Sequence, residues 1–144
     1  SRTGKIDKFT LDQSLENYYN YDASKKKSLD INDFDISFCR GLSLKNGGAT
    51  LTEFTTEILS NKLLDNDIYV CGGGRKNKYL MESLQKKISN NLILIDHLEV
   101  DGDFIESQAF AFLAIRSNLG LPISFPSTTG CKKPSTGGMI IESY

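Results

Sequence analysis

Apolar residues recur at helical spacing near the start of the chain, between residues 9 and 19. They are Leu11, Leu15, Tyr18 and Tyr19. This periodicity predicts a short amphipathic helix. The residues that follow, 20–35, are mostly Lys, Ser, Asp and Asn, which predicts a loop. The apolar residues expected to hold this loop against the rest of the domain are Leu29, Ile31 and Phe34.

A second helix is predicted from Thr50 to about Leu63. Asn46-Gly47-Gly48 interrupts the chain before it. Thr50 and Glu53 have the spacing of a capping box, in which each side chain satisfies a backbone group at the start of a helix. Asp65-Asn66-Asp67 is expected to end the helix. Its buried stripe is predicted to consist of Leu51, Phe54, Ile58 and Leu59.

Residues 68–95 have the pattern of a parallel βαβ unit. Ile68–Cys71 is a short β-prone run, Gly72–Gly74 is a turn, and helical spacing returns from Asn77 onward. Leu92–Ile95 is apolar at every position, as in a strand that is covered on both faces. Such units have a right-handed crossover. The predicted fold class is therefore α/β.

A further helix is predicted after this unit. Asp103 and Glu106 have the spacing of a second capping box, and an Ala- and Phe-rich run continues through Arg116 to a stop at Gly120. The remaining tail is rich in Pro, Ser, Thr and Gly. Its one strand-like run, Met139–Ile141, is expected to add an edge strand or to pair with another segment.

Composition and charge narrow the classes of function. The 144 residues suffice for one domain, and 39% apolar and 24% charged residues are ordinary for a globular protein. A net charge of -1 argues against nucleic-acid and membrane partners, and Lys25–Lys27 is interpreted as a solvated loop. Cys39, Cys71 and Cys131 form no C-x-x-C pair, which argues against a disulfide framework or a zinc site and favours the cytoplasm.

Two single residues receive structural interpretations. His97 is the only histidine and has no partner for a zinc site or a catalytic triad, so we expect a surface loop residue. Cys71 stands beside the glycine run, and we expect a buried, small apolar residue at the end of a strand.

Gly72–Gly74 is the most informative candidate for a binding site. Residues without a Cβ let the backbone approach a ligand closely, and the helix that follows presents unpaired N–H groups. The run matches neither G-x-x-x-x-G-K-[ST] nor G-x-G-x-x-G, whose last glycine would fall at Asn77. The pattern alone leaves two alternatives, a seat for a nucleotide or a tight turn between strand and helix.

Glu106 is the second candidate. It lies in the predicted first turn of a helix near Asp101 and Asp103, where it could hold sugar hydroxyls by charge-assisted hydrogen bonds. A Glu three residues after an Asp also serves the backbone at helix starts. Both interpretations remain open at this point.

The order and spacing of several short motifs resemble the anhydro-N-acetylmuramic acid kinase family from Gly4 to Ile141. The motifs are Ala49–Thr55, Val70–Gly74 with Asn77 and Leu80-Met81, Gly102-Asp103 with Glu106 and Ala109–Ala111, Leu121-Pro122, and Pro126–Gly130. The resemblance implies an actin-like, ribonuclease H-like lobe, with a mixed sheet and helices packed on it. It also implies a cytoplasmic bacterial enzyme of peptidoglycan recycling. Such an enzyme uses ATP, Mg²⁺ and water to open the 1,6-anhydro ring and phosphorylate the freed 6-hydroxyl.

The resemblance also implies roles for single residues. Gly72, Gly73 and Gly74 would lie against the nucleotide with Asn77 close by, and Glu106 would face the sugar. Lys27-Ser28-Leu29-Asp30 departs from the Pro-Lys-Ser-Thr-Gly-Arg-like segment that relatives usually carry.

By the same resemblance, residues 1–144 are a single carboxyl-terminal lobe. The phosphate-binding turns and the water-activating aspartate would belong to an amino-terminal lobe, so we expect no catalytic residue or metal ligand in this chain and no activity from it alone. A homodimer is expected by analogy. Two alternatives remain, a sugar kinase of the same superfamily with another acceptor, and an assembly module that keeps the fold without catalysis.

Overall fold

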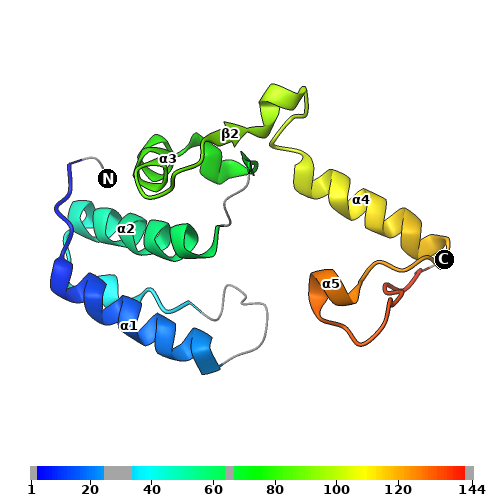
Figure 1. Cartoon of the computed structure of the whole chain (residues 1–144), viewed down its shortest axis with the longest axis horizontal. Coiled ribbons are helices and arrows are strands. Elements are labelled where there is room, and N and C mark those ends of the chain that lie inside the picture. The colour runs from blue at the N-terminus through cyan, green and yellow to red at the C-terminus, as the bar shows by residue number, and fades with distance from the viewer. Residues whose placement is uncertain (1–2, 25–33, 64–66, 142–144) are drawn as a thin grey trace. The chain divides into compact units, whose positions relative to one another are not determined.

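The computed structural model describes residues 3–24, 34–63 and 67–141 (Figure 1). The chain forms two compact units, Ser1–Gly102 and Asp103–Tyr144, and each is described by itself. The first unit contains α1 (Lys8–Ser24), η2 (Ser37–Cys39), α2 (Leu44–Lys62), β1 (Ile68–Val70), η3 (Gly73–Lys76), α3 (Lys78–Gln85), β2 (Leu92–Leu94) and η4 (Ile95–Leu98). The second contains α4 (Ile105–Asn118) and α5 (Pro126–Thr129).

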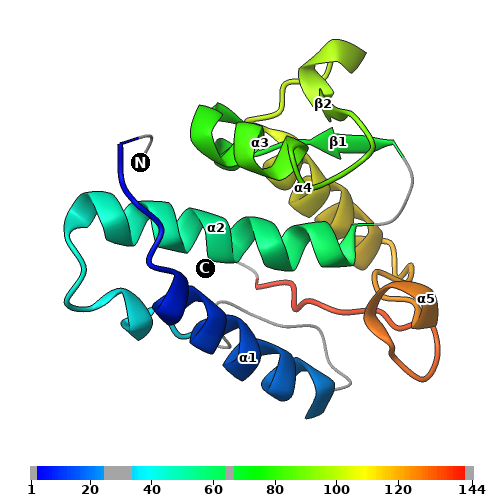
Figure 2. The ribbon, with the colours of Figure 1, turned by 60° about the vertical axis from the view of Figure 1, so that its left-hand side comes forward.

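Helices α1 and α2 lie side by side and enclose the core of the first unit (Figure 2). The buried members of this core are Leu11, Tyr18, Phe54 and Ile58. The predicted first helix is confirmed, but the prediction of a loop from residue 20 is wrong, because α1 continues to Ser24. Phe34 does pack on the domain, since its ring stacks on Tyr18 at 5.9 Å between ring centres.

Helix α2 begins earlier than predicted. Ser43 is its N-cap and accepts a hydrogen bond from the Asn46 N–H at 3.3 Å, and Gly47 lies buried inside the helix. The prediction that Thr50 and Glu53 start the helix is therefore wrong. A glycine inside a helix costs about 1 kcal/mol relative to alanine. A Cβ at Gly47 would lie 3.8 Å from Leu42 Cβ and 3.9 Å from Cys39 Cβ, which are ordinary contact distances, so the helix continues through a glycine that packing does not require.

The segment before α1 is fastened along the first turns of α2. The Lys5 N–H donates to Asn46 Oδ1 at 3.0 Å, and the Asp7 N–H donates to Thr50 Oγ1 at 3.0 Å. A Cβ at Gly4 would stand 1.9 Å from the Lys45 carbonyl oxygen, so only glycine fits there. Thr50 is thus a buried anchor for another segment.

The far end of α2 agrees with the prediction more closely. The helix ends at Lys62 with Leu63 as its C-cap. Phe54 and Ile58 are buried, but Leu59 is 37% exposed, so its place in the predicted buried stripe is wrong. Other predictions fall on residues outside the described ranges. They concern Lys25–Lys27, Lys27–Asp30, Leu29, Ile31 and Asp65-Asn66.

The predicted parallel βαβ unit is confirmed. Strands β1 and β2 pair in parallel with Ile68 opposite Leu92 and Val70 opposite Leu94, and α3 connects them. Asn77 caps α3, since its Oδ1 accepts a hydrogen bond from the Leu80 N–H at 3.2 Å. The side chains of β2 are all half-buried rather than covered on both faces. The described residues thus form a mixed α/β fold with a small parallel sheet.

Helix α3 packs against α2, and an ion-pair cluster joins the two elements. Lys87, just after α3, donates to Glu53 at 2.7 Å and also to Glu57. Glu53 therefore serves tertiary packing instead of the predicted cap. This cluster attaches the βαβ unit to the helical pair.

The second unit is built on α4. Its N-cap is Phe104 and makes no side-chain capping bond, so the predicted capping box of Asp103 and Glu106 is wrong. The predicted stop is confirmed, because Gly120 has a φ of 67° and the Leu121 N–H donates to the Arg116 carbonyl, as in a Schellman motif. Met139–Ile141 is exposed and forms no strand in the structure, so the predicted edge strand is wrong, whereas pairing with a missing partner segment stays a prediction.

Candidate functional site

The candidate site lies where the two parallel strands end. Because β1 and β2 run in the same direction, the loops that follow Val70 and Leu94 meet at one edge of the sheet. Ligands of open α/β sheets bind in this position, outside the carboxyl ends of the strands. The triple glycine, Gly72–Gly74, forms the first of these loops.

The glycine loop has one face that is open in the described structure. Gly72 has a φ of 75°, a conformation that side chains with a Cβ rarely adopt. A Cβ placed on Gly72 or Gly73 would meet no atom within 4 Å, and one on Gly74 would lie 3.8 Å from a Leu80 methyl group. The backbone of this loop is therefore open to contact on the side where Gly72 and Gly73 would carry a Cβ.

Arg75 ties the glycine loop to the loop after β2. Its Nε donates to Asp96 Oδ2 at 3.0 Å, and its Nη2 donates to Asp96 Oδ1 at 3.2 Å. Its Nη1 donates to the Gly72 carbonyl oxygen at 2.9 Å. The Asp101 carboxylate lies 3.9 Å from Nη2. Sequence patterns miss this arrangement, because 21 positions separate Arg75 from Asp96 and no motif joins them.

Gly102 contacts both the glycine loop and Arg75. Its carbonyl oxygen accepts a hydrogen bond from the Gly72 N–H at 2.8 Å, and its α-carbon is packed under the guanidinium of Arg75. The hydrogen bond from Arg75 lowers the pKa of Asp96 by more than burial raises it, and hydrogen bonds from the backbone of Asp96 and Gly102 lower it further. Asp96 therefore carries a negative charge opposite the cation.

The structure brings together the residues predicted for the nucleotide, but not all predicted residues. Gly72–Gly74 and Asn77 share one loop of the first unit, where the Asn77 side chain caps α3. Glu106 lies in the first turn of α4, exposed, in the second unit. The two groups therefore belong to different units.

Of the two remaining single-residue predictions, the one for His97 is confirmed and the one for Cys71 is wrong. His97 is exposed in η4, as expected of a surface residue. Cys71 is exposed, so the prediction of burial is wrong. It follows β1 at the open end of a two-stranded sheet, where no further element covers it among the described residues.

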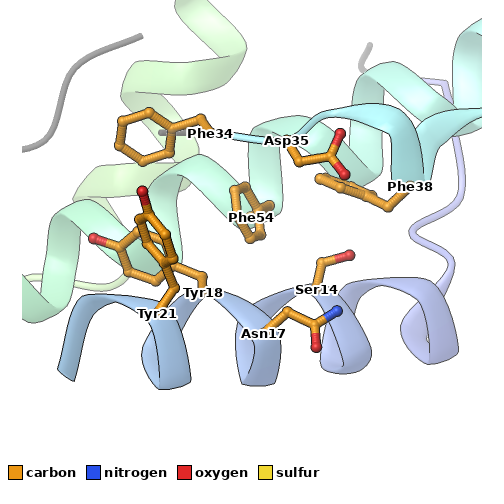
Figure 3. Close-up of a pocket in the computed structure, with 8 residues that line it drawn as sticks. All are labelled: Ser14, Asn17, Tyr18, Tyr21, Phe34, Asp35, Phe38 and Phe54. Carbon is orange, nitrogen blue, oxygen red and sulfur yellow. The ribbon is translucent and has the colours of Figure 1, made fainter. Parts of the chain in front are cut away.

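A separate cavity of about 490 Å³ lies in the helical pair (Figure 3). Its lining residues are Ser14, Asn17, Tyr18, Tyr21, Phe34, Asp35, Phe38 and Phe54. Hydrogen bonds from Ser37 lower the pKa of Asp35, which is therefore a carboxylate at the rim. None of the glycine-loop residues lines this cavity, and residues 25–33, which precede Phe34, lie outside the described ranges, so we assign it no role.

Within residues 3–24, 34–63 and 67–141, no group of three or more His, Cys, Asp or Glu side chains is placed to hold a metal ion. In the same part of the chain, no helix combines the length and apolar character that crossing a bilayer requires.

Comparison with known proteins supports the resemblance. The profile of the anhydro-N-acetylmuramic acid kinase family matches residues 1–143. A relative of that name from Pelagibacter ubique is 48% identical over 155 aligned positions, which cover 100% of this chain and 41% of the relative. Relatives of the same name from Brucella anthropi and Rhizobium rhizogenes are 42% and 41% identical, over 96% and 98% of this chain and 38% and 39% of theirs.

The chain spans about two fifths of the length of the curated relatives that it matches. The match nevertheless extends over all the described elements, from the segment before α1 to the tail after α5. The chain belongs to the anhydro-N-acetylmuramic acid kinase family.

Proposed function

We propose that this chain supplies the nucleotide-facing part of an ATP-dependent kinase that acts on anhydro-N-acetylmuramic acid. In the proposed reaction, water gives a proton to a base of the other lobe as its oxygen bonds to C1 of the sugar, and the bond from C1 to O6 breaks. The freed O6 takes the γ-phosphoryl group of ATP, and ADP leaves. The observation that carries the proposal is the open glycine loop at the carboxyl ends of two parallel strands, in a chain of this family.

The loop suits a nucleotide because of its shape. The absence of side chains at Gly72 and Gly73 leaves room for a ligand directly against the main chain. Asn77, which caps the helix that follows, is proposed to lie next to the bound nucleotide. The chemistry of the loop is therefore binding and orientation, which account for most of the catalysis in phosphoryl transfer.

The sugar side of the proposed site is Glu106. Its carboxylate is exposed in the first turn of α4, where it could accept hydrogen bonds from sugar hydroxyls. Its role rests on the family resemblance of Gly102-Asp103 with Glu106. We propose that Glu106 orients the sugar and does not itself activate water.

The rest of the machinery is proposed to lie in the other three fifths of a complete family member. Parallel sheets in α/β proteins are normally larger than two strands and covered on both faces. The described sheet has only β1 and β2, which fits one actin-like lobe whose sheet is completed by other parts of the protein. In this proposal residues 1–144 form the carboxyl-terminal lobe.

Mg²⁺ would neutralise charge on the phosphates of bound ATP. Protein sites for Mg²⁺ commonly use one or two carboxylates together with substrate phosphates. The described residues offer no cluster of ligands of their own, so we place the metal-holding side chains in the other lobe. Unpaired cysteines at 39, 71 and 131 fit the proposed reducing cytoplasm. The homodimer stays a prediction.

The proposal is tested with a hybrid protein in which this chain replaces the corresponding two fifths of the Pelagibacter ubique relative. The hybrid should convert ATP and anhydro-N-acetylmuramic acid to ADP and a sugar 6-phosphate, and the isolated chain should not. A folded hybrid that phosphorylates only other sugars would support the alternative acceptor. A folded hybrid without any turnover would favour the assembly module.

A further inference from the structure

We propose that Arg75, held by Asp96, is a positioning residue that fixes the glycine loop in its nucleotide-binding conformation and thereby determines the affinity for ATP. The inference rests on the proposed function, because it takes the loop to be the seat of the nucleotide. It assigns a role to a pair that neither the sequence motifs nor the family resemblance marks.

The glycine loop would be flexible if nothing restrained it. Three adjacent glycines have more conformational freedom than any other run of three residues, and ordering them on binding costs entropy. A loop that is already held in its bound shape avoids most of that cost. Some part of the structure must therefore restrain Gly72–Gly74 if the loop binds a nucleotide well.

Both backbone polar groups of Gly72 form hydrogen bonds. Its carbonyl oxygen accepts a hydrogen bond from Arg75 Nη1 at 2.9 Å, and its N–H donates to the Gly102 carbonyl at 2.8 Å. These bonds fix the residue whose φ is 75°. The turn at the entry to the glycine run is thereby set from two sides.

Arg75 is itself anchored outside the glycine loop, by Asp96. Arg75 Nε and Nη2 grip both carboxylate oxygens of Asp96, which lies in η4 after β2. The Arg75 side chain is only 7% exposed, whereas Asp96 is 42% exposed. A bidentate pair of this kind fixes orientation as well as distance.

Lysine cannot replace arginine at position 75. Lysine offers one compact ammonium group, whereas the planar guanidinium of Arg75 serves Asp96 and the Gly72 carbonyl at the same time. Arg75→Lys therefore keeps the charge but loses the geometry. Asp96→Asn keeps the shape of the side chain but removes its charge.

The test uses the hybrid kinase with Arg75→Lys or Asp96→Asn, and measures kcat, the KM for each substrate and the unfolding midpoint. We expect the KM for ATP to rise roughly tenfold, as for the loss of one charge-assisted hydrogen bond. The KM for the sugar and kcat should change less than about twofold, within the usual scatter of distant substitutions.

The matched control is Lys87→Met, which removes another part-buried cation of the first unit, one whose ion pairs are with Glu53 and Glu57 of α2. It should lower the unfolding midpoint and leave the KM for ATP unchanged. If Arg75→Lys behaves in the same way as Lys87→Met, the positioning role is wrong. A hybrid that uses ATP, but whose KM for ATP does not change with Arg75→Lys, would overturn this inference alone. An unmodified hybrid that never uses ATP would overturn the proposed function on which the inference rests.

A second measurement works on the isolated chain and needs no catalysis. Amide hydrogen exchange of residues 72–77 should be faster in Arg75→Lys than in the unmodified chain, while exchange in α2 stays the same. Equal exchange in the loop would show that Arg75 does not restrain it, and would also overturn the inference.

Discussion

Gly102 lies directly under the guanidinium of Arg75. A Cβ on Gly102 would stand 2.7 Å from Arg75 Nε, 2.9 Å from Cζ and 3.0 Å from Asp96 Oδ2. The absence of a side chain at this position is therefore a condition for the ion pair that spans the two loops. Asp101-Gly102-Asp103 is a turn, as its sequence indicates, but the glycine is also required by residues distant in the sequence.

We predict that Gly102→Ala lowers the free energy of unfolding by about 1–3 kcal/mol, the usual cost of forcing extra atoms into a packed site. Chemical denaturation of the chain measures this change. Gly73→Ala is the control, because its Cβ would meet no atom within 4 Å. Equal stability of the two variants would contradict the packing described around Arg75.

The buried hydroxyl of Thr50 gives a second prediction. Thr50→Val should cost about 1–3 kcal/mol, because the Asp7 N–H loses its acceptor and the Asn46 carbonyl loses a donor. Thr50→Ser keeps both hydrogen bonds and should cost less. Thermal unfolding of both variants checks this order. A harmless Thr50→Val would contradict the role of this hydroxyl as an anchor for the segment before α1.

The Lys87 cluster predicts a dependence on alkaline pH. Burial lowers the pKa of Lys87, but the hydrogen bonds that Lys87 donates to Glu53 and Glu57, together with the negative charges of these carboxylates, raise it by more, so the net pKa lies above the ordinary 10.5. A raised pKa in the folded state contributes stability that is complete below the unfolded-state value and is lost as the pH rises through the folded-state value.

Lys87→Met should therefore be less stable than the unmodified chain by a constant amount between about pH 7 and about pH 9. Denaturation curves recorded at higher pH should show this difference shrinking. A difference that persists unchanged well above the pKa of lysine would mean that packing of the Lys87 side chain, and not its charge, provides the stability.

Asp96 predicts the opposite dependence, at acid pH. Its pKa is lowered from 3.8 chiefly by the hydrogen bond from Arg75, so its contribution is complete above the unfolded-state value and is lost as the pH falls through the folded-state value. The difference in stability between the unmodified chain and Asp96→Asn should thus be constant at neutral pH and disappear in acid. The same difference at every pH would rule out the ionic contribution.

The two glycine clusters show what the sequence can and cannot predict. Gly72–Gly74 follows a β-prone run, and the strand, turn and helix predicted around it are all present. Asn46-Gly47-Gly48 has a similar composition but lies inside α2. Local composition indicates a break in both cases. In the second case the helix already begins at the Ser43 cap, four residues before Gly47, and runs through both glycines.

The candidate site was also predictable only in part. Its glycines stand next to each other in the sequence, and the alternation of strand and helix places them at the end of a parallel strand. Arg75, Asp96 and Gly102 come together only in the folded chain. No sequence motif near Arg75 or Asp96 indicates that the two residues pair, so only a structure could reveal the contact.

The central claim, that the open face of the glycine loop receives ATP, is tested most directly by calorimetric titration of the Gly73→Ala hybrid with ATP and Mg²⁺. The added methyl group enters space that is empty in the described structure, so folding should be unaffected. The account predicts binding at least roughly tenfold weaker than in the unmodified hybrid, a loss of about 1.4 kcal/mol. Unchanged affinity for ATP in a folded Gly73→Ala hybrid would contradict it.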